Sequence, residues 1–194
     1  MLSQLKLSAA LRKTVENELI PGEYIRWIGQ PVPRFFTGAS IGSVIFAIPW
    51  TSFALFWTWG ALGFKLPDLR EGLRPEYLFA MFGIPFILIG LAMLSSPLWV
   101  WQAARKTVYL ITDKRAIIIQ GGWSTIIRSY APDQLNDTYR QERRNNIGDV
   151  IITVRRWKDS DGDSRSEEIG FLEIRNPREA EALLKQLARS APSV

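Results

Sequence analysis

Two long stretches without a charged side chain constrain what this chain can fold into more than any other feature. Between Phe35 and Phe64, and again between Tyr77 and Ala104, there is no Asp, Glu, Lys or Arg. A helix needs about 20 consecutive apolar residues to cross the hydrocarbon core of a bilayer, and both stretches exceed that length. We therefore predict transmembrane helices at 36–57 and 78–101, joined by an external loop at 58–77.

The alternative is an apolar hairpin buried inside a globular protein. A chain of 194 residues leaves too little material to cover two such helices once they are set aside. A secretory signal peptide is also disfavoured, because the first stretch follows a mostly polar segment and its apolar core is too long. Pro49, Pro85 and Pro97 are compatible with membrane helices where neighbours satisfy the freed carbonyls.

The flanks of the two stretches predict the orientation. Lys and Arg are more numerous before the first stretch and after the second than in the loop between them, which predicts cytoplasmic termini. Aromatic residues at the ends of both stretches are predicted membrane-interface residues: Phe35, Trp57, Trp59, Tyr77, Trp99 and Trp101. Gly38 and Gly42 form a GxxxG pair, a spacing that allows close helix contact but is also frequent by chance. Neither stretch contains an ionisable residue, which disfavours transport.

The N-terminal segment, residues 1–20, is predicted to be an amphipathic helix. Leu7, Leu11, Val15 and Leu19 recur every four residues, so they share one face. Two positions fit this helix: the membrane surface, or the surface of the C-terminal domain. Residues 21–35 are rich in Pro and Gly and are predicted to be an extended connector.

Residues 105–190 are predicted to form a second, β-rich domain. Short apolar and β-branched runs alternate with turn residues and predict six or seven strands; NDTYRQERR is a polar candidate for an edge strand. The last element is a predicted helix with Asn176 as N-cap, Pro177 in the first turn and Glu179 completing a capping box. Its apolar stripe is Ala180, Leu183, Leu184, Leu187 and Ala188.

Several segments resemble the bacterial pleckstrin-homology-like (PH-like) domain family. They are YLITDKRAIIIQGG, SYAPDQL, GDVIITV and GFLEIRNPREAEALL, together with PGEYIRWIGQP before the first apolar stretch. The resemblance implies an α+β chain in a bacterial cytoplasmic membrane: a two-helix transmembrane hairpin plus a partly open β-barrel of six or seven strands, capped by a C-terminal helix. It implies no activity, because this fold serves many binding roles.

Basic residues of the domain are the candidate site for an anionic ligand such as a lipid head group: Arg140, Arg143, Arg144, Arg155, Arg156 and Lys158. Acidic residues are interleaved with them, so a solvated surface of mixed charge is the alternative. DSDGD at 159–163 lacks the glycine and glutamate positions of a helix-loop calcium site and predicts a hairpin turn with Asp161-Gly162 at its tip. Trp123 and Trp157 are predicted to be core or membrane-facing residues.

The sequence contains no Cys and no His. Thiolate and imidazole catalysis and most zinc sites are therefore excluded, and no catalytic, metal or cofactor residue is predicted. We expect a non-enzymatic binding or assembly module with two kinds of partner: the bilayer, and a second copy or another protein. Nucleic acid and small-molecule substrates are not expected. The alternative function is a sensor of anionic lipid head groups that uses the basic residues above.

Overall fold

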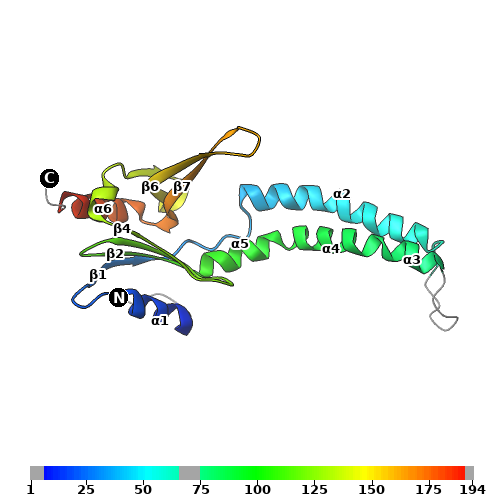
Figure 1. The fold of residues 1–194 in the computed structure, drawn as a ribbon, viewed down its shortest axis with the longest axis horizontal. Helices are drawn as coiled ribbons and strands as arrows, with labels where there is room; N and C mark the ends of the chain where they lie inside the picture. The colour runs from blue at the N-terminus through cyan, green and yellow to red at the C-terminus, as the bar shows by residue number, and fades with distance from the viewer. Residues whose placement is uncertain (1–6, 66–74, 191–194) are drawn as a thin grey trace. The chain divides into compact units, whose positions relative to one another are not determined.

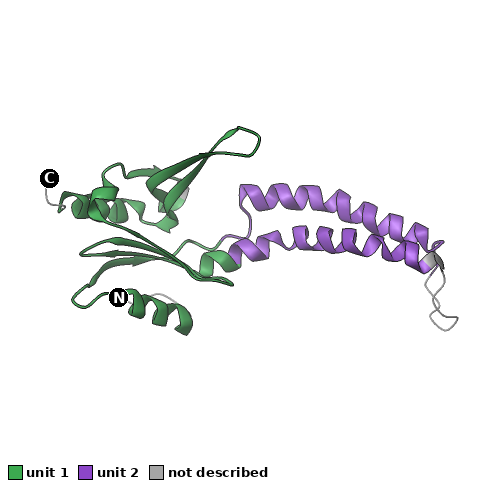
Figure 2. Ribbon diagram, in the orientation of Figure 1, with its two compact units in different colours: residues 1–33, 102–194 green, residues 34–101 purple. Residues whose placement is uncertain are grey.

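The computed structural model describes residues 7–65 and 75–190, in two compact units (Figure 1, Figure 2). The β-unit comprises residues 1–33 together with 102–194, and the helical unit comprises residues 34–101. The helical unit is thus inserted into the chain of the β-unit. The inner part of the predicted external loop, residues 66–74, lies outside the described residues.

The helical unit consists of α2 (Gly38–Ala61), α3 (Pro75–Met81), α4 (Gly83–Leu94) and the start of α5 (Ser96–Arg105). Two segments are long and apolar enough to cross a membrane: Gly38–Ala61, with a mean hydropathy of 1.6, and Tyr77–Leu94, with 2.3. Only 22% and 17% of these segments are buried within the protein. A helix in the core of a globular protein would be mostly buried, so the buried-hairpin alternative does not fit.

Side-chain hydroxyls of Ser and Thr make hydrogen bonds at the start of α2 and where α2 meets the neighbouring helices. Thr37 caps α2 with Ser40: the Ser40 N–H donates to Thr37 Oγ1 at 3.3 Å, and the Thr37 N–H donates to Ser40 Oγ at 2.8 Å. Pro97 cannot donate to the Met93 carbonyl four residues earlier, and the Ser43 hydroxyl of α2 donates to that oxygen at 3.4 Å. Because α4 ends at Leu94 and Pro97 lies in the first turn of α5, α2 here supplies a donor to a carbonyl in the last turn of α4.

The β-unit contains an antiparallel sheet of four strands, called sheet A. Its order is β1 (Ile25–Gly29), β2 (Thr107–Thr112), β3 (Ala116–Gln120) and β4 (Ile126–Tyr130). β1 lies within residues 21–35, so the expected extended connector contains a strand of the sheet. That strand comes from before the helical insertion and pairs with β2 after it, with Gly29 opposite Tyr109.

The two inner strands of sheet A, β2 and β3, are buried on both faces. Leu11 and Val15 of α1 (Ala9–Glu18) pack against one face, which presents Val108, Leu110, Ile117 and Ile119. Figure 1 shows α1 lying along this sheet. Of the two positions that the sequence left open for the N-terminal helix, the structure shows the one on the β-rich domain. Residues 1–6 of the predicted helix lie outside the described residues.

Sheet B has three strands, in the order β5 (Tyr139–Glu142), β6 (Ile147–Lys158) and β7 (Ser164–Arg175). The edge-strand prediction for NDTYRQERR is confirmed by β5. Six of the strands, β2 to β7, lie within 105–190, where six or seven were predicted, and β1 joins them from before the insertion. The two sheets are open and do not close into a barrel. The short 3-10 helix η2 (Pro132–Leu135) separates β4 from β5. It buries Leu135 in the core instead of continuing the hydrogen-bond ladder.

The C-terminal helix α6 (Pro177–Arg189) covers the remaining side of the core between the sheets. Ala180, Leu184 and Leu187 are buried as the apolar stripe predicts. The predicted capping box is wrong in detail, because the Asn176 side chain accepts no backbone hydrogen bond. Asn176 is left-handed, with φ 52°, a conformation that Asn tolerates better than most residues. Its side-chain amide donates to Glu179 Oε2 at 2.9 Å.

Candidate functional site

Two of the six predicted anion-binding residues are already neutralised within the protein. Arg140 forms ion pairs with Glu142 and Glu181. Arg143 contacts Asp149 at 2.7 Å and Glu173 at 2.8 Å. A guanidinium that bridges two carboxylates has little charge left for an external anion.

Three others lie on a separate, exposed element. Arg155, Arg156 and Lys158 occupy the outer half of β6, which pairs with the first half of β7; we call residues 153–169 the β-ribbon. All three side chains are exposed, and among the described residues none of the three takes part in an ion pair. Arg144 lies in η3 (Arg144–Asn146), and its side chain is outside the described part of the structure.

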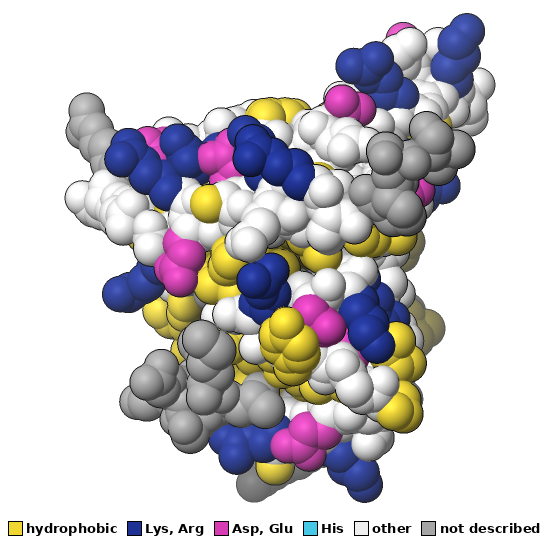
Figure 3. Space-filling view, turned by 90° about the vertical axis from the view of Figure 1, so that its left-hand side faces the viewer, with side chains coloured by type: hydrophobic (Ala, Val, Ile, Leu, Met, Phe, Trp, Pro, Cys, Tyr) yellow, Lys and Arg dark blue, Asp and Glu magenta, His cyan; other side chains and the backbone are white. Residues whose placement is uncertain are grey.

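The structure therefore does not gather the five predicted residues with described side chains into one basic site. Cross-strand register places Arg155 opposite Glu167 and Trp157 opposite Arg165, and Arg165 pairs with Asp159 at 2.8 Å. Figure 3 shows one face of the molecule, where Lys and Arg are interspersed with Asp and Glu. The mixed-charge surface that the sequence offered as the alternative describes this face better than a single basic patch does.

The β-ribbon ends in the predicted hairpin turn. The Asp159 N–H donates to the Asp163 carbonyl at 2.8 Å, and the Gly162 N–H donates to the Asp159 carbonyl at 2.9 Å. Gly162 has φ 85°, a conformation that glycine adopts without steric cost. The turn is hydrophilic, and it contains three acidic residues: Asp159, Asp161 and Asp163.

A buried ion pair ties the segment before the insertion to the domain after it. The Glu23 side chain is fully buried, and it receives hydrogen bonds from Arg115 Nε at 3.0 Å and Nη2 at 3.1 Å. The Thr112 hydroxyl donates to Glu23 Oε1 at 2.7 Å, and the Ile20 N–H donates to Oε2 at 3.0 Å. Arg115 Nη2 also donates to the Glu18 carbonyl at 2.7 Å. We call this network the Glu23–Arg115 clasp.

The clasp fixes the charge of Glu23. Burial by itself raises the pKa of this carboxyl, but the hydrogen bonds from Arg115, the Ile20 N–H and Thr112, together with the charge of Arg115, outweigh burial. The pKa of Glu23 is therefore below its ordinary value of 4.5. Because its oxygens are occupied by donors, Glu23 has a structural role and is not placed to act as a general base.

Asp149, a second buried carboxylate, is satisfied in the same way. It accepts the Glu173 N–H at 2.6 Å and an Arg143 N–H at 2.7 Å. Glu173 has φ 53° and sits at a register shift between β6 and β7. This bulge lets Phe171 and Ile174, three residues apart, both enter the core. The network shapes β7 and offers no free acid for chemistry.

An aromatic stack centred on Phe171 links β1 to the rest of the core. The Trp27 ring stacks on Phe171 with centroids 5.6 Å apart, and Tyr109 stacks on Phe171 at 4.9 Å. Burial raises the pKa of the Tyr109 phenol to about 12, and the nearby carboxylates of Asp149 and Glu173 add to the rise. This tyrosine is therefore neutral at any physiological pH and serves as a core residue.

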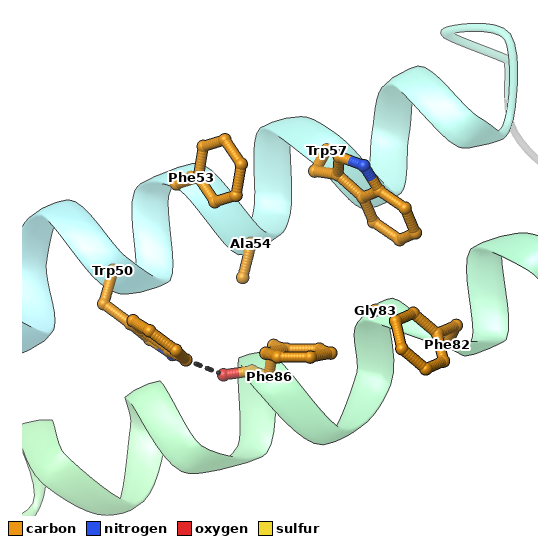
Figure 4. Close-up of a pocket in the computed structure, with 7 residues that line it drawn as sticks. All are labelled: Trp50, Phe53, Ala54, Trp57, Phe82, Gly83 and Phe86. Carbon is orange, nitrogen blue, oxygen red and sulfur yellow. Dashed lines mark hydrogen bonds between the residues drawn. The ribbon is translucent and has the colours of Figure 1, made fainter.

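The helical unit carries an apolar cavity of about 300 Å³ between its helices (Figure 4). One side of the cavity is formed by α2, and the other by the start of α4. The lining residues are Trp50, Phe53, Ala54 and Trp57 from α2, and Phe82, Gly83 and Phe86 from the other helix. The Trp50 Nε1–H donates to the Phe86 carbonyl at 3.1 Å, which satisfies the indole in apolar surroundings. The lining offers shape but no charged or titratable group.

The predicted interface aromatics are found mainly in pairs at the helix ends. Phe35 stacks on Trp101 with centroids 5.4 Å apart, and Trp57 packs on Phe79 at 5.0 Å. Trp59 and Trp99 are exposed, and the Trp99 indole donates to Ser95 Oγ at 2.9 Å. Tyr77 lies in α3 and is half-buried.

The β3–β4 hairpin exposes apolar residues, among them Trp123, which was predicted to be a core or membrane-facing residue. Trp123 is 103% exposed, so it is not a core residue, and Ile126 and Ile127 of β4 are 46% and 38% exposed. β4 is also the last strand of sheet A, so its outer edge has no partner strand in the sheet. The absence of charge from Ala116 to Ile127 was the sequence signal that could have drawn attention to it.

Comparison of this chain with family models, with curated proteins and with solved structures gives no significant match.

Proposed function

We propose that this chain is a membrane-anchored, non-enzymatic binding and assembly module at the cytoplasmic surface of a bacterial membrane. The observation that carries the proposal is the insertion of two membrane-competent helices into a folded β-unit. Because β1 precedes the insertion and β2 follows it, the domain is complete only when both ends of the hairpin lie on one side of a membrane. The excess of basic residues on those flanks favours the cytoplasmic side.

The architecture of the β-unit supports a PH-like identity for the binding part. Seven strands are followed by one helix that covers the core, as the resemblance implies. The open sheets leave strand edges available, whereas a closed barrel would have none. Both buried carboxylates are occupied by arginine, which is consistent with a binding role rather than with catalysis.

The outer edge of β4 is the binding surface that we favour. Unpaired backbone groups on an edge strand can hydrogen-bond an added strand, and flanking side chains give that contact its specificity. Ile126 and Ile127 supply exposed apolar surface on this strand. A second copy of the chain, paired β4 to β4, would bury both edges and give a two-fold dimer.

Cross-linking in intact membranes tests this surface. The chain has no native Cys, so single cysteines at each position of β4 from 126 to 130 can be oxidised without competing thiols. We expect a disulfide-linked dimer for at least one of these positions, because paired strands bring Cα atoms within the 4.4–6.8 Å that a disulfide needs. Ser160→Cys on the β-ribbon tip is the matched control. A monomer at micromolar concentration by light scattering in detergent, with no cross-link along β4, would contradict assembly.

A second candidate function is recognition of anionic lipid head groups, now restricted to the β-ribbon. Arg155, Arg156 and Lys158 have no ion-pair partner among the described residues, and each basic residue near an anionic surface contributes about 1 kcal/mol. In nanodiscs, a spin label at Ser160→Cys should lose mobility when anionic lipid replaces neutral lipid. The change should disappear in the triple variant Arg155→Gln, Arg156→Gln, Lys158→Gln. Equal mobility in both lipids would exclude this function.

A further inference from the structure

The two long hairpin turns of the β-unit differ sharply in character. The β6–β7 turn contains Asp159, Asp161 and Asp163, whereas the stretch from Ala116 to Ile127 around the β3–β4 turn contains no charged residue. At the tip of the β3–β4 turn, residues 121–125, Trp123 is fully exposed. Ile126 and Ile127, which follow it in β4, are also exposed, and exposed apolar residues grouped in this way mark interaction sites.

The register of sheet A places this turn at one defined end of the sheet. Thr107, at the start of β2, lies opposite Gln120, at the end of β3, and Gln120 lies opposite Ile126, at the start of β4. Gly29, at the end of β1, lies opposite Tyr109. The Gly121 N–H also donates to the Lys106 carbonyl at 2.8 Å.

That end of sheet A is where the chain leaves for the membrane-competent helices and returns from them. β1 ends at Gly29 before the segment that leads into α2, and β2 begins at Thr107 directly after α5. The β2–β3 turn and the Glu23–Arg115 clasp lie at the opposite end of the sheet. The β3–β4 turn is thus the third chain segment at the end to which both membrane connections attach.

Helix geometry brings this end within reach of the head-group layer. Lys106 follows Trp101, the last predicted interface aromatic, by five residues, or about 7.5 Å along a helix at 1.5 Å per residue. The head-group region on each side of the hydrocarbon is roughly 5–7 Å thick. Trp123 lies two residues beyond Gly121, which is hydrogen-bonded to Lys106, so the turn lies within a few residues of the point where the chain returns from the helices.

The surroundings of the turn fit lipid better than a charged partner. A shallow cavity of about 190 Å³ beside it is lined by small and neutral residues of the α1 start and the turn, and Lys106 is the one charged residue among the described lining residues. Tryptophan is enriched at membrane interfaces because it combines a large apolar ring with one polar N–H. A basic side chain beside it suits the lipid phosphates.

We propose that the β3–β4 turn is a third membrane contact, in which Trp123 inserts into the lipid interface beside the two membrane connections and Lys106 faces the lipid phosphates. This inference rests on the membrane anchorage proposed above. It gives sheet A three attachment points at one end, so the domain is held in one orientation to the bilayer. Two attachment points would leave it free to rock about the line that joins them.

Site-directed spin labelling of the full-length chain, one copy per nanodisc of neutral lipid, tests the contact, because neutral lipid does not recruit the basic β-ribbon. Labels are placed at Ser124→Cys next to Trp123, at Ser160→Cys on the acidic turn, and at Ile45→Cys within α2. We expect the label at 124 to be accessible to oxygen and shielded from a water-soluble nickel chelate, and the label at 160 to show the reverse. Adding Trp123→Ser to the Ser124→Cys chain should raise chelate access at 124 without changing thermal stability, since Trp123 is fully exposed in the folded domain.

The outcomes separate this inference from the proposed function. If the label at 45 is lipid-embedded but the label at 124 is as open to the chelate as the label at 160, the third contact is wrong and the membrane anchorage stands. If the label at 45 is itself open to the chelate, the anchorage fails and the inference fails with it. If the label at 124 is shielded from both oxygen and the chelate, the turn is covered by protein, which also overturns the lipid contact.

Discussion

At the scale of single residues, the side chains that matter most for folding are the buried charges, and Glu23 is the best example. Replacing Glu23 with Gln leaves Arg115 without its carboxylate, and breaking such a pair costs about 3 kcal/mol at the lower end of measured values, since Arg115 keeps some contact with water. We expect the free energy of unfolding of the full-length chain to fall by about this amount at pH 7. Glu16→Gln on exposed α1 is the control and should change it by less than about 0.5 kcal/mol.

The same clasp predicts a pH dependence. Because the pKa of Glu23 is lowered in the folded chain relative to its ordinary value of 4.5, the folded state binds fewer protons than the unfolded state near that pH. The stability that the carboxylate provides is fully present above about pH 4.5 and is lost as the pH falls through the folded pKa. The difference between the native chain and Glu23→Gln should therefore narrow on acidification below pH 4.5. A constant difference between pH 7 and pH 3 would show that the charge of Glu23 contributes nothing.

The residue scale is also where the sequence predicted least. Arg140 and Arg143 looked equivalent to Arg155 and Arg156, because composition does not show which carboxylates come close in space. Glu181 and Glu173 lie far along the chain from the arginines that they neutralise. Likewise, nothing in the order of residues reveals that Glu23 meets Arg115 across the whole helical insertion. Ion pairs between residues that are far apart in the chain form only when the fold brings the two side chains together, so local sequence patterns do not predict them.

At the scale of elements, two glycines of α4 set the contact between the membrane-competent helices. A Cβ at Gly90 would overlap the Thr51 hydroxyl, and a Cβ at Gly83 would overlap that of Thr58. Gly38 and Gly42, the pair that the sequence singled out for close contact, have open space where a Cβ would be. The pairing of α2 with α4 thus depends on small residues facing small residues, at other positions than the GxxxG motif.

This difference gives a matched pair of substitutions. Gly90→Val should force α2 and α4 apart and lower the stability of the helical unit by about 1–3 kcal/mol, the usual cost of overpacking, whereas Gly42→Val should leave it unchanged. Thermal unfolding of the full-length chain in detergent measures both. If Gly42→Val lowered the unfolding temperature in dilute detergent more than Gly90→Val does, the contact of Gly90 with α2 would not be the main source of stability in the helical unit.

The periodicity of the sequence predicted most elements correctly, and the exceptions have a common cause. The two apolar helices, the amphipathic α1, the hairpins and α6 follow from local patterns of apolar residues. β1 was missed because IRWIG is short and sits among Pro and Gly, and it is stable only through its pairing with β2 and the stack of Trp27 on Phe171. The open sheets were missed because barrel closure depends on which strand edges meet, which local patterns do not encode.

At the scale of the whole molecule, the chain of the β-unit is interrupted by the helical unit. Residues 105–190 alone, the predicted domain, lack α1, β1 and the Glu23 side of the clasp. Their loss would expose Val108, Leu110, Ile117 and Ile119 and remove the ring of Trp27 from Phe171. At about 1.5–3 kcal/mol for each large apolar side chain, this loss is comparable to the total stability of 5–15 kcal/mol of a typical domain.

We therefore expect two soluble versions of this protein to behave differently. The fragment 105–190 should be unfolded or aggregated, whereas a chain that joins residues 7–33 to residues 102–190 through about 12 Gly/Ser residues should fold without detergent. A linker of that length has a mean span of roughly 17–21 Å. Near-ultraviolet circular dichroism of the buried Trp27 and Tyr109 environment and cooperative thermal unfolding measure the outcome. Adding Glu23→Gln to the joined chain should lower the midpoint of its thermal transition, because the clasp is one of the contacts that hold the first half on the second. A cooperative thermal transition of the fragment 105–190 would contradict this prediction. It would show that the fragment folds without α1 and β1, so that the helical unit precedes a complete domain and does not interrupt it.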